Sequence, residues 1–232
     1  MPTIAMLKQD MESTKSLGDI VDVLKIAALM QFHAFQLKEW KPKQDFLNIA
    51  EDIFNVLVSK GLEHPFLFDR PTLPSLIVVI TSDEGFLGDL NMLAINAALN
   101  IVKTSEDHVL CLGRRGARYL EDTDVSYKVF PGVSSEINTD ELEPLKLYIL
   151  NGYKKKFGRV YIIYPKFISL AVQKIDKVLL LPYQKSSQAK ILRGFFIDEM
   201  LIEPAISHVL EMLIEIYLDF RLLDIFWMSK RS

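Results

Sequence analysis

Two neighbouring carboxylates and two glycines lie together at a sharp turn in the sequence. The segment LIVVITSDEGFLGDLN, residues 76–91, places Asp83 and Glu84 directly after an apolar run and just before Gly85 and Gly88. Paired carboxylates can bind a metal ion or transfer a proton, and glycine-rich turns can bind phosphate through backbone amides. This turn therefore has three candidate roles: a phosphate-binding loop, a catalytic elbow, or a structural joint between a strand and a helix.

The spacing within the turn favours the structural joint. A Walker A loop needs four residues between its glycines, followed by Lys and then Ser or Thr, and this pattern is absent here. The dinucleotide fingerprint G-x-G-x-x-G and the nucleophile elbow G-x-S-x-G are absent from it as well. Asp83 and Glu84 would repel a phosphate, whereas acidic residues at the start of a helix are stabilised by the helix dipole.

The other reactive side chains are dispersed along the sequence. The four histidines, His33, His64, His108 and His208, show no metal-ligand spacing. The one cysteine, Cys111, lies inside an expected buried strand, which favours an inert thiol over a nucleophile.

A pair of arginines lies in a second glycine-bounded turn. Arg114 and Arg115, between Gly113 and Gly116, could bind an anion, although a solvated turn after a strand is the favoured interpretation. These residues assemble no active site, so we expect no catalytic residue, no metal ion and no cofactor.

Composition narrows the class of protein. Of the 232 residues 50% are hydrophobic and 25% charged, which is typical of a globular protein with a sizeable core. The net charge of -3 gives no general attraction to nucleic acid, and a single cysteine forms no internal disulfide. The first residues lack the apolar core of a secretory signal, and no stretch reaches the ~20 uncharged apolar residues of a membrane-spanning helix.

Three regions follow one another along the chain. Residues 1–73 are predicted to form a long N-terminal helix with a kink or break at Pro42, because apolar residues recur at three- and four-residue steps. Residues 74–203 alternate between strand and helix, which predicts an α/β domain with a Rossmann-like, mostly parallel sheet. Residues 204–232 are helical again. If the two terminal helices run antiparallel, they form a coiled coil with the α/β domain inserted between them.

The central region is expected to contain five strands, a further candidate strand and three helices. The strands are predicted at 76–81, 108–113, 127–130, 160–164 and 172–181, with the further candidate at 195–197; the helices are predicted at 91–102, through Arg118 and Tyr119, and at 139–157.

Four segments in collinear order resemble the gamma subunit of F-type ATP synthases. The segment ITSDEGFLGDLN at 80–91 is similar to that family's ITSDRGLCGGLN, and LGRRGARYL at 112–120 is similar to its IGRKGRDFF. YPKF at 164–167, with Gln173 and LLP at 180–182, resembles YNKF…Q…LLP, and residues 14–36 resemble the family's N-terminal helix. The resemblance covers nearly the whole chain.

The resemblance implies a rotor shaft without a catalytic site of its own. In that family the gamma subunit is the central stalk of a proton- or sodium-translocating ATP synthase. Its terminal helices form an antiparallel coil inside the ring of alpha and beta subunits, and its α/β domain contacts the epsilon subunit and the membrane c-ring. Rotation of the c-ring is thereby coupled to conformational change in the catalytic beta subunits. The resemblance also implies a peripheral membrane protein facing the cytoplasm, matrix or stroma, with no nucleic-acid partner.

The matching positions supply candidate partner-contact residues. They lie in four places: the expected N-terminal helix, the turn at 82–88 with the helix start at Asn91, the turn at 113–116, and the YPKF segment. The candidates are Lys15, Lys25, Ser82, Asp83, Glu84, Gly85, Gly88, Asn91, Arg114, Arg115, Lys166 and Phe167.

Three features differ from the family pattern. The C-terminal helix is expected to be shortened, because the family's helix continues beyond the position that matches Ser232. The N-terminal stripe carries Asp19 and Asp22 where basic or small residues are common, and Pro42 adds a kink where the family helix runs on.

Two other functions stay open. A gamma-derived binding or assembly protein that no longer transmits rotation is favoured by the short C-terminal helix. A small nucleotide- or phosphate-binding enzyme would instead use the carboxyl ends of the strands.

Overall fold

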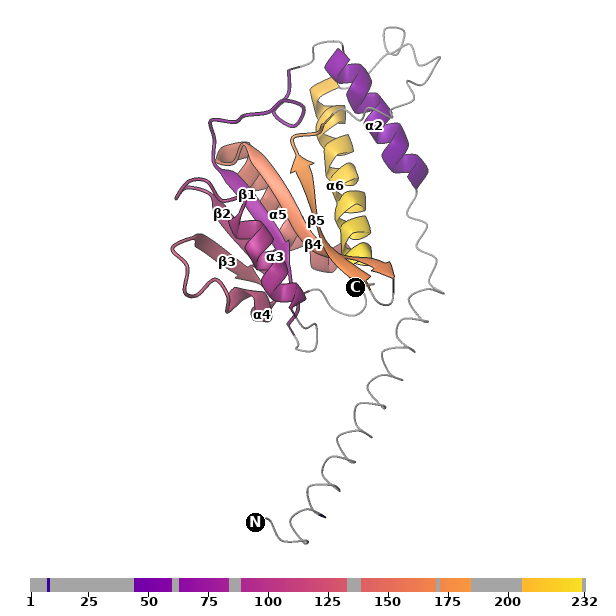
Figure 1. Ribbon diagram of the computed structural model, residues 1–232. Helices are drawn as coiled ribbons and strands as arrows, with labels where there is room; N and C mark the ends of the chain where they lie inside the picture. The colour runs from indigo at the N-terminus through magenta and orange to yellow at the C-terminus, as the bar shows by residue number, and fades with distance from the viewer. Residues whose placement is uncertain are drawn as a thin grey trace. The chain divides into compact units, whose positions relative to one another are not determined.

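The structure is a computed structural model, and it describes residues 8, 44–59, 63–83, 89–132, 139–169, 172–184 and 206–230. Residues 42–230 form one compact unit, and its architecture is drawn in Figure 1. Several sequence-based expectations lie outside the described residues: the strand at 195–197, the kink at Pro42, and the candidate contacts Lys15, Lys25, Glu84, Gly85 and Gly88.

A five-stranded sheet forms the centre of this unit, in the order β3-β2-β1-β4-β5. The strands are β1 (Ser75–Ile80), β2 (His108–Leu112), β3 (Ser126–Phe130), β4 (Arg159–Ser169) and β5 (Val172–Leu181). β1 pairs in parallel with β2 and β4, β2 pairs in parallel with β3, and β5 pairs antiparallel with β4. The mostly parallel α/β sheet predicted from the sequence is therefore confirmed.

The sequence of β1 explains its central place in the sheet. SLIVVI is an almost unbroken apolar run rich in branched side chains, which suits a strand covered on both faces. Leu76, Ile77, Val78 and Val79 have no exposed surface. The edge strand β3 has the opposite character, because Ser126 to Val129 are all exposed.

The helices cover both faces of the sheet (Figure 1). They are α2 (Gln44–Ser59), α3 (Leu90–Leu99), α4 (Arg114–Ala117), α5 (Thr139–Lys155) and α6 (Ile206–Lys230). α3 lies in front of the sheet in this view, and α5 and α6 lie behind it.

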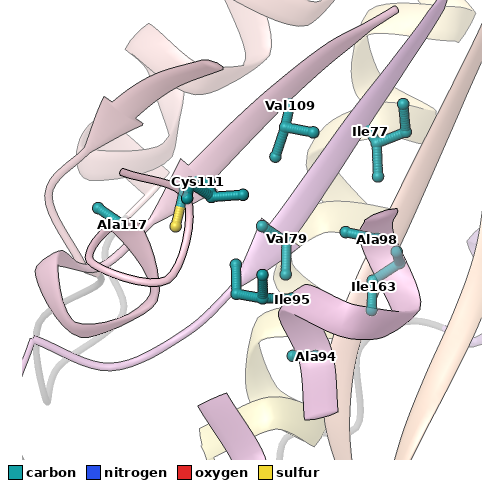
Figure 2. Packing of buried hydrophobic residues seen from close by; sticks show 10 residues of the cluster. Ile77, Val79, Ala94, Ile95, Ala98, Val109, Cys111, Ala117 and Ile163 are labelled. Carbon is teal, nitrogen blue, oxygen red and sulfur yellow. The ribbon is translucent and has the colours of Figure 1, made fainter. Parts of the chain in front are cut away.

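Small side chains let α3 approach the sheet closely. Ala94 and Ala98 of α3 face Ile77 and Val79 of β1, and all four are buried (Figure 2). Ile163 of β4 belongs to the same cluster. Fully burying a branched aliphatic side chain stabilises a fold by roughly 1.5–3 kcal/mol, so this cluster is a major part of the core.

The α6 helix is tied to the rest of the unit by apolar and ionic contacts. Its Leu218 and Phe226 are buried, and the helix packs on β4 and α5. Between α5 and α6, Lys146 Nζ lies 2.9 Å from a carboxylate oxygen of Asp219 and 2.7 Å from one of Glu143. Burial alone would lower the pKa of Lys146, but these two carboxylates outweigh it and raise that pKa above its ordinary value.

Aromatic side chains join α2 to the end of β5 and to α6. The ring of Phe54 lies 5.2 Å from that of Tyr183 and 5.3 Å from that of Tyr217. The Tyr183 hydroxyl lies 3.2 Å from Asn55 Oδ1. The predicted antiparallel coiled coil involves the segment upstream of α2, nearly all of which lies outside the described residues, so that part of the fold stays a prediction.

β4 is longer than the sequence indicated. The predicted strand ended at Tyr164, directly before Pro165, a residue type that cannot donate a hydrogen bond within a ladder. The observed strand continues to Ser169. β1 pairs with β4 only as far as Ile163, so Pro165 pairs with β5 alone, at Ile175, and its missing N–H disrupts no second ladder.

Candidate functional site

One carboxylate joins the carboxyl ends of three strands. Asp83 follows β1, and its Oδ1 accepts a hydrogen bond from the backbone N–H of Arg114 at 2.8 Å, directly after β2. Its Oδ2 accepts a hydrogen bond from the backbone N–H of Gly132 at 2.8 Å, just after β3. We call these three residues, Asp83, Arg114 and Gly132, the carboxylate latch.

Glycines make room for the turn after β1. Gly113 has φ +100°, a backbone conformation that favours glycine, and a Cβ there would lie 2.6 Å from the carbonyl oxygen of Thr81. A Cβ on Gly116 would collide with the Thr81 side chain, and a Cβ on Gly132 would collide with the Asp83 carboxylate. Larger side chains at these positions would therefore push the strand ends apart.

Side-chain hydrogen bonds connect the same turn to α3 and to β2. Ser82 N–H donates to Asn91 Oδ1 at 3.1 Å, and Asn91 Nδ2 donates to Ser82 Oγ at 2.9 Å. The backbone N–H of Arg115 donates to the Ser82 carbonyl at 3.0 Å, and the Thr81 hydroxyl donates to the Leu112 carbonyl at 2.6 Å. Asn91 is buried, so it fixes the start of α3 against the turn.

The structure brings part of the predicted contact set together. Ser82, Asp83, Asn91, Arg114 and Arg115 meet at the carboxyl ends of β1 and β2 through the bonds given above. The Arg114 side chain is 84% exposed, and its Nε lies 3.7 Å from Asp83 Oδ1. The guanidinium therefore forms an exposed ion pair with Asp83, and its solvent-facing side can still contact a partner while the Arg114 backbone belongs to the latch.

Lys166 and Phe167 lie farther along the neighbouring strand β4. Val79 of β1 pairs with Ile163 of β4. Lys166 lies three residues after Ile163, and Ser82 lies three residues after Val79, so the two are at the same level of the sheet. Lys166 Nζ lies 2.9 Å from Asp176 Oδ2 on β5. Burial tends to raise the pKa of Asp176, but hydrogen bonds from Lys166 and from the Lys177 backbone outweigh it and hold that pKa below its ordinary value.

The polar groups at the strand ends bind one another and hold the strands together. The N–H groups of Arg114 and Gly132, which could have bound an external anion, are occupied by Asp83. Cys111 has no exposed surface, and burial raises its pKa to about 11, so the thiol is protonated and inert at neutral pH, as its predicted position in a buried strand indicated. Within the described part of the chain, no group of three or more His, Cys, Asp or Glu side chains could hold a metal ion.

Sequence reasoning did not select Gly132 or Thr81. Gly132 follows Pro131 directly after β3, and a Pro-Gly pair marks a turn, but nothing local indicates that its N–H meets Asp83. Thr81 ends an apolar run and looks like a strand residue. Both roles depend on contacts between distant parts of the chain.

Comparisons with known proteins identify the family of this chain. The chain matches the family model described as ATP synthase over residues 3–232. The ATP synthase gamma chain of Geotalea daltonii is 25% identical over 217 residues, covering 90% of this chain and 75% of the relative. The gamma chain of Cytophaga hutchinsonii is 23% identical over 226 residues, covering 92% and 77%.

A solved structure has the same fold. The central stalk and c-ring structure of the Tetrahymena thermophila mitochondrial ATP synthase contains a chain with a TM-score of 0.66 and 15% identity; the match covers 91% of this chain and 93% of that one. The two chains therefore share a fold. The chain belongs to the ATP synthase gamma family, whose members are a non-catalytic subunit of the complex. Among the described helices, none has the length and apolar character needed to cross a membrane.

Proposed function

We propose that this chain is the rotor shaft of a proton- or sodium-translocating F-type ATP synthase. In this role it couples rotation of the membrane c-ring to conformational change in the catalytic beta subunits. The observation that carries the proposal is the family match over residues 3–232 together with a central-stalk fold.

The packing of α6 supports a mechanical role. A shaft transmits torque only if its helix moves together with the domain that is driven. Leu218 and Leu222 of α6 are 0% and 1% exposed, and Lys146 of α5 forms an ion pair with Asp219 of α6. Turning α6 against the sheet would expose these apolar side chains and break the ion pair, so the helix and the domain move as one body.

The proposed partners follow from the same role. The terminal helices would contact the ring of alpha and beta subunits, with Lys15 and Lys25 as candidate contacts. The α/β domain would contact the epsilon subunit and the c-ring through the exposed Arg114 and Arg115 and through the YPKF segment. The chain would then lie peripherally on the cytoplasmic, matrix or stromal side of the membrane.

The test is ATP-driven rotation of the assembled complex. The full chain carrying Lys155→Cys would be co-produced with the alpha and beta subunits of its own organism and labelled with biotin maleimide at the exposed end of α5. Cys111 is buried and does not compete for the label, so the unsubstituted chain is the matched control. We expect a bead attached to the labelled chain to rotate in one direction during ATP hydrolysis.

Two results would contradict the proposal. A complex that contains the chain and hydrolyses ATP without bead rotation would identify an assembly protein instead of a shaft. A chain that forms no complex with alpha and beta subunits would refute both roles.

A further inference from the structure

The edge strand β3 offers an unpaired side of the sheet. β3 is the first strand in the order β3-β2-β1-β4-β5 and pairs only with β2 among the described strands, and Figure 1 shows it at the margin of the sheet. Side chains on both of its faces are exposed: Ser126 and Lys128 on one face, and Tyr127 at 36% and Val129 at 39% on the other. An edge of this kind can accept another strand through main-chain hydrogen bonds.

The register of β3 identifies the groups that face outward. The Phe130 carbonyl accepts a hydrogen bond from the Gly113 N–H at 3.0 Å, so the N–H and C=O of Phe130 point toward β2. Successive residues of a strand alternate, so Lys128 also points toward β2, and Tyr127 and Val129 point away. Within the described part of the chain, no hydrogen bond engages the outward N–H and C=O groups of these two residues.

We propose that β3 binds an extended segment of a partner protein in which an acidic residue lies between two apolar residues. The segment would add to the sheet as a strand beside β3. Its main chain would pair with Tyr127 and Val129, and its apolar side chains would cover theirs. Its carboxylate would lie opposite Lys128, on the other face of the sheet.

The surroundings of Lys128 favour an acidic partner. Its Nζ lies 4.6 Å from the centre of the Tyr148 ring and 5.2 Å from that of Phe130, and the side chain is exposed. The guanidinium of Arg114, near the carboxyl end of the strand, is already paired with Asp83, so Lys128 is the cation that a partner would meet here. A carboxylate beside β3 would therefore meet the exposed ammonium group of Lys128.

The same lysine disfavours pairing with a second copy of this chain. A symmetric antiparallel pair that used the outward groups of Tyr127 and Val129 would be centred on Lys128. Two Lys128 side chains would then lie directly opposite each other in a non-hydrogen-bonded pair, where side chains are closest. Like charges in that position destabilise the pairing. The occupant is therefore a different protein, and self-association is an outcome that the test can detect.

The test uses the full chain and two synthetic peptides. One peptide alternates valine with glutamate, and its matched partner alternates valine with lysine. Amide hydrogen exchange followed by NMR would report each residue of β3. We expect the glutamate peptide to protect the amides of Tyr127 and Val129, with little change at Lys128, whose amide already faces β2. The lysine peptide should bind at least about tenfold more weakly, because it places like charge beside Lys128.

Two variants separate edge pairing from general damage to the fold. Val129→Pro removes one outward N–H and leaves the ladder to β2 intact, since proline is tolerated on the free side of an edge strand. It should abolish protection by the glutamate peptide, whereas Val129→Thr, which keeps the N–H, should retain it. Lys128→Glu should reverse the preference, so that the lysine peptide binds more tightly than the glutamate peptide.

Several outcomes would overturn the inference. Equal binding of the two peptides, protection confined to residues outside β3, or unchanged preference in Lys128→Glu would each do so. Protection of Tyr127 and Val129 that grows with chain concentration in the absence of peptide would identify a second copy as the occupant. None of these results bears on bead rotation, so this inference and the rotor proposal can fail separately.

Discussion

The backbone N–H of Gly132 donates a hydrogen bond of 2.8 Å to Asp83, although the two residues are 49 positions apart in the sequence. Asp83 lies beyond the end of β1 and Gly132 beyond the end of β3, with β2 between them in the sheet. The carboxylate therefore spans the end of β2, where it also accepts the N–H of Arg114. An acidic residue in this turn is thus explained by internal backbone donors, without any external ligand.

Removing the charge of Asp83 should loosen this end of the sheet. In Asp83→Asn one carboxylate oxygen becomes an amide nitrogen that faces a backbone donor, so at least one hydrogen bond of the latch is lost. Hydrogen bonds to charged groups contribute about 1.5–3 kcal/mol, and partial exposure of Asp83 reduces this, so we expect a loss of about 1–2 kcal/mol in the free energy of unfolding. Urea unfolding would measure it. Asp122→Asn, on an exposed turn, is the control and should change stability by less than about 0.5 kcal/mol.

Adding a methyl group at position 132 should be harmful only while Asp83 keeps its side chain. In Gly132→Ala the new Cβ would occupy space now filled by the Asp83 carboxylate, and we expect a loss of about 1–3 kcal/mol. Asp83→Ala removes the clashing group, so the double variant should be more stable than the sum of the two single effects predicts. A double-mutant cycle from urea unfolding measures this coupling. Additive effects would show that the two residues do not interact.

Stability in acid should depend on Asp107 at the opposite end of β1. This buried carboxylate accepts hydrogen bonds from the backbone N–H groups of Ser75, Lys103 and Thr104 at 2.6, 2.8 and 2.9 Å. Burial would raise the pKa of Asp107, but the three N–H donors outweigh it and hold that pKa below its ordinary value.

A lowered folded-state pKa means that Asp107 stabilises the fold above its unfolded pKa of about 3.9. This contribution is lost as the pH falls through the folded pKa. In Asp107→Asn the free energy of unfolding should be lower at pH 7. Between about pH 5 and pH 2 it should also fall less steeply as the pH is lowered. The slopes of the two proteins should differ by up to about 1.4 kcal/mol per pH unit, the value for one bound proton. Urea titrations at several pH values would measure the slope. Equal slopes for the two proteins would refute the assignment.

Two lysines of α5 provide a matched comparison for the docking of α6. Lys146 is nearly buried and contacts Glu143 and Asp219, so Lys146→Met leaves two carboxylates without their cation. We expect this variant to lose about 1–3 kcal/mol and to exchange the amides of α6 faster. Lys154 is about half exposed and lies 3.5 Å from Glu211, so Lys154→Met should cost less than about 1 kcal/mol. Similar costs for both variants would contradict the importance of burial here.

The pattern of apolar residues within short segments was enough to predict most strands and helices. The contacts at the carboxylate latch could not be predicted in this way, because they join residues far apart in the sequence. The short apolar runs of β1 and β2, rich in branched side chains and bounded by turn residues, favour buried strands, so composition and length identify them. The extension of β4 past Pro165 depends on which neighbour pairs with each side of the strand, and the latch depends on the end of β3 meeting that of β1. Neither can be read from residues close in sequence.

The partners of Asp83 in the latch are neutral backbone amides, with the exposed Arg114 side chain only at its margin. Mobile ions screen attraction between exposed charged side chains far more than they weaken short bonds to main-chain groups. The joint that follows the central strand should therefore hold its shape in dilute buffer and in concentrated salt alike. Fastening through its own peptide groups thus makes the geometry of this joint independent of the surrounding electrolyte.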